Sequence, residues 1–102
     1  MSQPESITEA FLPLVPEIPE ADIPMMIAIL ERIAASNYVG WAQTAENEIE
    51  RKGLLACEAR ELEIAEFIES LYPNPQATID GLHTKFPDLQ ERYDAVMEGR
   101  SR

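Results

Sequence analysis

Apolar residues recur at helical spacing along most of this chain, and the pattern predicts an all-α fold. A first set follows the start signal "ADIPMM", where Pro24 suits the first turn of a helix and Asp22 or Ile23 lies near the cap. The set keeps its spacing through Met26, Leu30, Ile33, Tyr38, Trp41, Ala45 and Ile49. We therefore expect one long helix from about 24 to 51, bent at Gly40 or divided there into two.

A second helix is predicted from about 54 to 71. Before it, Arg51 and Lys52 suit the negative end of the first helix dipole, and Gly53 is a plausible terminator. The second helix has Glu63, Glu66 and Glu69 on its outer side. Its broad apolar face consists of Leu54, Leu55, Cys57, Leu62, Ile64, Ala65, Phe67, Ile68 and Leu71. The two helices are expected to form an antiparallel hairpin.

The remainder of the chain predicts two short helices divided at Pro87. The motif "YPNPQ" stops the hairpin's second helix, and Asn74 with Pro75 caps the next one. One apolar stripe, which can close over the hairpin, consists of Leu82, Phe86, Leu89, Tyr93, Val96 and Met97. No repeat or strand-like alternation interrupts residues 24–102, which we interpret as a single helical domain ending in a charged tail, "RSR".

Residues 1–23 form a proline-rich arm ahead of that domain. Proline at every third position from 13 to 19 favours polyproline II, which has three residues per turn. That periodicity aligns Leu12, Val15 and Ile18 along one edge. The arm is expected either to pack on its own domain or to strap onto a neighbouring subunit or another protein.

Charge narrows the classes of partner. The 102 residues include 19 acidic and 8 basic ones, and the net charge is −11. Such a surface repels phosphate backbones and anionic lipid, so we expect neither nucleic-acid nor membrane binding, and it attracts cations. The single cysteine, Cys57, excludes an intrachain disulfide. With no signal peptide or membrane span visible, the expected location is cytoplasmic.

Three glutamates fall inside or beside the apolar stripes. Glu31 is in register with Ile27, Ala34 and Tyr38, and Glu58 and Glu61 are i,i+3 partners among Leu54, Leu55, Leu62 and Ala65. A buried carboxylate needs a partner cation or keeps its proton. In an antiparallel hairpin these acids can converge, so Glu31, Glu58 and Glu61 are candidate metal ligands.

Plainer interpretations of the same residues stay open. The acids can lie near the stripe by chance and be neutralised by Arg32 or Arg60. Cys57 is a small buried hydrophobe or a thiolate ligand, and His83 is a surface histidine or a further ligand. The rings of Tyr38 and Trp41 belong to the core or to a dimer contact.

From Glu31 to Ile68 the chain resembles the ferritin-like superfamily, in particular the encapsulated-ferritin type. That pattern has a metal-binding glutamate followed seven residues later by an aromatic, matched by Glu31 and Tyr38. A second glutamate then opens a Glu-x-x-His-Ala step, where Glu61 and Ala65 match but Ile64 replaces the histidine. The resemblance implies a two-helix subunit that completes its bundle, and an iron site at the interface, by oligomerisation.

Two functions follow as hypotheses. The first is a ferritin-like protein that binds iron or another divalent cation through Glu31, Glu58 and Glu61, with oxidation of Fe(II) as its enzymatic form. Because Ile64 replaces the histidine, the ligands would be nearly all oxygen, which suits Mg, Ca or Mn as readily as iron. The alternative is a non-enzymatic adaptor or accessory subunit that binds a larger protein through its arm and acidic helices.

Overall fold

The computed structural model describes residues 11–100, with side chains from 11 to 97. The elements in chain order are η1 (Leu12–Glu17), η2 (Glu20–Asp22), α2 (Ile23–Gln43), α3 (Glu48–Glu69), α4 (Pro75–Lys85) and α5 (Leu89–Arg100). The predicted all-α fold is confirmed for these residues, none of which is in a strand. Residues 1–10 of the predicted arm and 101–102 of the predicted tail lie outside the described residues.

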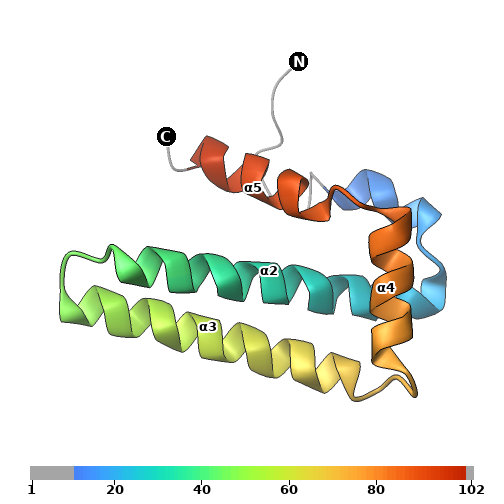
Figure 1. The fold of residues 1–102 in the computed structure, drawn as a ribbon, viewed down its shortest axis with the longest axis horizontal. Helices are drawn as coiled ribbons and strands as arrows, with labels where there is room; N and C mark the ends of the chain where they lie inside the picture. Colours follow the sequence, from blue (N-terminus) through green and yellow to red (C-terminus); the bar gives the residue numbers. More distant parts are fainter. Residues whose placement is uncertain (1–10, 101–102) are drawn as a thin grey trace.

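Helices α2 and α3 pack side by side as an antiparallel hairpin, as predicted (Figure 1). The predicted helix from 24 to 51 is wrong in its last third, because α2 ends at Gln43 and α3 begins at Glu48. Asn47 causes the break: its side-chain oxygen accepts a hydrogen bond from the amide of Glu50 at 2.8 Å and caps α3. Local capping thus interrupts an apolar pattern that runs on without a gap.

The two charged residues and the glycine that were expected to end the first helix lie inside α3 instead. Arg51 is in the first turn of α3 and pairs with Glu48, and Lys52 follows it. Gly53 continues the helix and does not terminate it, because its φ is negative like that of every described glycine. A glycine needs a left-handed conformation to stop a helix in the usual way.

The two C-terminal helices begin and end as the sequence predicts. Asn74 caps α4 by accepting a hydrogen bond from the amide of Ala77 at 3.3 Å, and Pro87 separates α4 from α5. Helix α4 lies across one end of the hairpin, and α5 runs back along α2 on the side away from α3 (Figure 1). The predicted stripe is confirmed: Leu82, Phe86, Leu89, Tyr93 and Val96 are buried in the core and Met97 packs against it.

The described part of the arm is a 3-10 helix, η1, rather than polyproline II over residues 12–17. Both conformations have about three residues per turn, so Leu12 and Val15 share an edge as predicted. That edge faces outward, however, whereas Phe11, Leu14 and Ile18 enter the core. The described arm therefore packs on its own domain and leaves an apolar edge exposed.

Helix α2 lies at the centre of the fold, and α3, α4, α5 and η2 all pack on it. The Cα positions span 42 × 38 × 17 Å, and the radius of gyration is 14.7 Å. A compact chain of this length has a radius of gyration of about 13 Å. The Cα trace of a single helix is about 4.6 Å across, so the shortest extent of 17 Å exceeds one helix. Apolar side chains of both hairpin helices nevertheless stay partly exposed, among them Trp41 and Ile64.

No helix among the described residues is long and apolar enough to span a membrane.

Candidate functional site

The seam of the hairpin is built on small side chains. Ala28, Ala35 and Ala42 recur every seven residues on α2 and are buried, and Ala65 is the fully buried residue of α3. Residues three or four positions from these alanines lie on the two flanks of the seam. The position of each charged residue relative to this alanine line therefore tells which flank it occupies.

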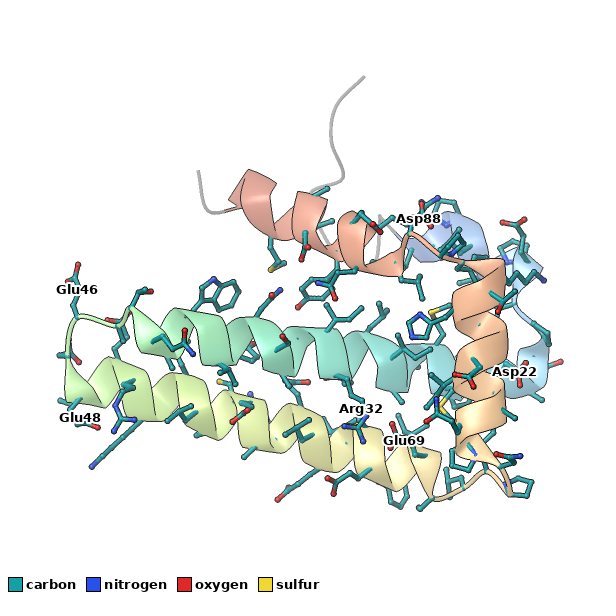
Figure 2. The ribbon with its side chains drawn as sticks, viewed as in Figure 1. Asp22, Arg32, Glu46, Glu48, Glu69 and Asp88 are labelled. Carbon is teal, nitrogen blue, oxygen red and sulfur yellow. The ribbon has the colours of Figure 1, made fainter. Side chains whose placement is uncertain are left out.

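One flank is closed by an ion pair between Arg32 and Glu69, which lie four residues after Ala28 and Ala65 respectively (Figure 2). The Arg32 Nε and Nη2 atoms donate to the two carboxylate oxygens of Glu69, each at 2.6 Å. This bidentate hydrogen bond lowers the pKa of Glu69 and raises the pKa of Arg32. Glu69 was predicted on the outer side of its helix, and that prediction is wrong.

The opposite flank carries Glu31 and Glu61. Glu31 follows Ala28 by three residues and precedes Ala35 by four, and Glu61 precedes Ala65 by four. Both side chains are half-buried. Because the helices are antiparallel, the flanks that bear these two carboxylates adjoin each other across the seam, away from Arg32 and Glu69.

Glu58 lies on the seam itself, because it precedes buried Ala65 by seven residues. Its side chain is half-buried, like those of Glu31 and Glu61. None of these three glutamates forms a hydrogen bond or ion pair with another described residue. The alternative that Arg32 neutralises them finds no support, since Arg32 is committed to Glu69. Arg60 instead points its Nη2 toward the Cys57 sulfur, 3.9 Å away.

Within the described chain, no three His, Cys, Asp or Glu residues come together as a ready metal site. The Arg32–Glu69 pair sets the register of the antiparallel helices, and in that register Glu58 and Glu61 lie about two helical turns or more along the hairpin from Glu31. The three glutamates therefore do not form a ligand set in a single subunit, and their role as ligands stays a prediction. His83 is exposed, as predicted, and lines a separate cleft of about 300 Å³ with Arg32 where α2, α4 and α5 meet.

Around Glu31 and Glu61, apolar side chains reach the surface. We call this flank the open face; it comprises Ile27, Glu31, Tyr38 and Trp41 of α2 and Cys57, Glu61, Ile64 and Ile68 of α3. Ile27, Trp41 and Ile64 are 45%, 43% and 38% exposed. The rings of Tyr38 and Trp41 meet edge to face with centroids 5.6 Å apart. Trp41 thus belongs to this face and not to the core.

Comparison of the chain with models of protein families, with curated proteins and with solved structures gave no match. The resemblance to ferritin-like proteins stays a prediction carried by the sequence.

Proposed function

We propose that this protein is a ferritin-like subunit that pairs with a second copy through the open face and holds a divalent cation at the interface. The observation that carries the proposal is the position of Glu31 and Glu61, two half-buried carboxylates in the middle of an uncovered apolar face. The cation would lie between these carboxylates from both copies, with Glu58 on the adjoining seam as a further ligand.

The exposed apolar side chains of the open face support pairing. Helices normally bury their apolar stripe between two layers, and α3 packs on α2 alone along its length. Ile64 and Trp41 remain partly exposed on the open face, and burial of such side chains contributes about 25 cal/mol per Å² of apolar surface. Stacking two hairpins face to face would complete a four-helix bundle and cover both side chains.

Pairing would also create the need for a cation. In one subunit water still reaches Glu31 and Glu61, because each is only half-buried. A second copy would exclude that water, and an antiparallel arrangement of the two copies would place Glu31 of each copy beside Glu61 of the other. Two carboxylates brought together away from water are strongly unfavourable without a counter-charge. Arg32 faces the other flank, and Arg60 reaches this one only beside Cys57, where its Nη2 lies 3.9 Å from the sulfur and makes no ion pair with Glu31 or Glu61. A divalent ion would supply the missing charge.

The donor set limits the ion. Carboxylate oxygens suit Mg, Ca and Mn, and they also bind Fe(II). Ile64 occupies the position where the resemblance expects histidine, so the proposed function is metal binding. Oxidation of iron is proposed only for the case in which the bound ion is Fe(II).

The test compares matched glutamates. Light scattering after size exclusion measures the mass with and without Mn(II), and with Fe(II) under nitrogen. We expect the metal to favour the dimer of the wild-type protein, and to raise its free energy of unfolding by about 2.7 kcal/mol at a concentration one hundred times the Kd. Glu61→Gln and Glu31→Gln should abolish the metal effect, whereas Glu63→Gln, the same change at an exposed position, should leave it intact.

The metal site would be refuted if neither the mass nor the melting temperature of the wild-type protein changes on addition of any of these ions. Pairing has a separate test: Ile64→Asp should keep the protein monomeric by placing a charge in the interface. If wild-type protein is itself monomeric at millimolar concentration with and without metal, the proposal as a whole fails.

A further inference from the structure

An apolar groove of about 240 Å³ lies between η1 and the first half of α2. Every side chain that lines it is apolar. Leu14, Ile18 and Met26 form its buried base, and Leu12, Val15 and Ile27 stand at the rim with 61%, 39% and 45% of their surfaces exposed. Neither the core nor the seam of the hairpin uses Leu12 or Val15, so this edge of the arm has no role within the subunit.

The wall of the groove is held rigidly. Prolines fix the backbone of η1, which contains Pro16 and ends where the amide of Ile18 donates to the carbonyl of Val15 at 3.1 Å. The ammonium of Lys85 donates to the carbonyl of Glu17. The hydroxyl of Tyr72 donates to the carbonyl of Ala21 at 2.7 Å. A ligand entering the groove would therefore meet a preformed surface, with little ordering cost on this side.

The charge around the groove is mostly negative. No lysine or arginine occurs in residues 1–31, and Glu17, Glu20, Asp22 and Glu31 lie on the elements that form the groove. Glu17 and Glu20 are exposed. Lys85 brings one positive charge to this region, because its ammonium donates to the carbonyl of Glu17, and the acidic side chains outnumber it. The groove thus combines an apolar base with acidic surroundings.

We infer that this groove docks an amphipathic helix of another protein, one that carries lysine or arginine beside its apolar stripe. A helix presents apolar anchors at i, i+3 and i+4, the usual way in which a helix fills such a groove. Its basic residues would meet Glu17 and Glu20, and opposite charge selects the partner and speeds association.

A second copy of this chain is the poorer occupant. Phe67 is exposed on its α3 and Leu71 in the turn that follows, and both stand near Glu63, Glu66 and Glu69. They would bring acid to an acidic groove, which disfavours the contact. The groove shares Ile27 with the open face, but Leu12 and Val15 lie outside that face, so their substitution tests the groove apart from the metal site.

The test uses a fluorescent synthetic peptide of leucine and lysine, about four helical turns long, with leucine at helical spacing. One comparison peptide has glutamate in place of lysine, and another has the same composition in scrambled order. Fluorescence anisotropy measures binding to the full chain. We expect the ordered lysine peptide to bind, and the other two to bind at least about tenfold more weakly, a difference of ~1.4 kcal/mol.

Protein variants then locate the site. Leu12→Ser with Val15→Ser should weaken the binding by about tenfold or more without changing the net charge. Ile49→Ser, at a position 86% exposed near the hairpin turn, serves as the matched control and should bind like the wild type. Glu17→Gln with Glu20→Gln should weaken binding and make it less sensitive to salt.

Two outcomes overturn the inference. Equal binding by the Leu12→Ser/Val15→Ser variant and the wild type would mean that charge alone attracts the peptide. A wild-type dimer, seen by light scattering without peptide and dissociated by the same two substitutions, would assign the groove to a second copy. Because both side chains are exposed, the variant should retain its helical CD signal and melting temperature, which shows that lost binding is not lost folding.

Discussion

The hydroxyl of Tyr72 accepts a hydrogen bond from the amide of Met25, 47 residues earlier in the chain, at 3.2 Å. Met25 lies in the first turn of α2, where backbone amides have no partner within the helix. Asp22, the residue at the cap position, makes no side-chain hydrogen bond to this turn. Tyr72 lies just after the C-terminus of α3 and therefore caps the N-terminus of α2, which links the start of the hairpin to its end.

Tyr72→Phe removes this cap and also the bond to the Ala21 carbonyl. The Met25 amide then loses its partner in a partly buried place, and the Ala21 carbonyl loses one at an exposed position. We therefore expect the free energy of unfolding to fall by about 1–2 kcal/mol. Urea titration followed by CD measures the change. Tyr38→Phe is the control, since no described residue bonds to its hydroxyl. Equal stability of the two variants would contradict the role given to Tyr72.

The Arg32–Glu69 pair predicts a pH dependence. The hydrogen bond from Arg32 lowers the folded-state pKa of Glu69 below its unfolded value. The pair therefore stabilises the fold at pH values above the unfolded-state pKa of Glu69. This contribution is lost as the pH falls through the lowered folded-state pKa. Because both side chains are partly exposed to water, Glu69→Gln should cost only about 0.5–1 kcal/mol at pH 7.

The measurement is the free energy of unfolding of Glu69→Gln and wild type across acid and neutral pH. The gap between the two should narrow toward zero in acid. Glu63→Gln, an exposed glutamate without a described ion pair, is expected to show no comparable gap. A gap that is constant with pH would exclude the ion pair as its cause.

Asn47 is predicted to secure the hairpin turn. Asn47→Ala removes the 2.8 Å bond to the amide of Glu50 and should cost about 1 kcal/mol. Asn74→Ala removes the equivalent bond at the start of α4, which is longer at 3.3 Å. Thermal unfolding of the two variants should therefore show the larger loss for Asn47→Ala. The reverse order would mean that capping does not set the turn.

Gly53 offers a stabilising change. It lies inside α3, its φ is not positive, and a Cβ added there would meet nothing within 4 Å. Gly53→Ala should therefore raise the free energy of unfolding by about 0.5–1 kcal/mol. The matched change in the same helix, Ala59→Gly, should lower it by a similar amount. If Gly53→Ala destabilises the protein instead, the added methyl group meets something other than this subunit.

The sequence by itself predicted the helical class, the hairpin and the two C-terminal helices. Apolar spacing and proline punctuation are local signals, and Pro73, Pro75 and Pro87 mark breaks that no tertiary contact needs to confirm. The hairpin turn was misplaced because the apolar spacing runs on through Ala45 and Ile49. The capping bond of Asn47 sets the start of α3 instead, and hydrophobic periodicity does not reveal such a bond.

For the candidate site, spacing identified Glu31 and Glu61 as residues near the seam, but it also put Glu69 on the wrong side. Glu69 follows Leu62 by seven residues and Ala65 by four, so its place on the inner face was visible in the sequence. What could not be predicted was its partner, because Arg32 lies 37 residues away and only the hairpin packing brings the two together.

Local rules thus determined which segments of this chain are helices and which side of each helix is apolar. The packing of those helices around α2, the outward turn of Leu12 and Val15, and the position of Glu31 and Glu61 on an exposed flank were decided only by the tertiary structure. The reason is physical: a helical stripe specifies that a face must be covered, whereas the choice of what covers it depends on contacts between residues far apart in the chain.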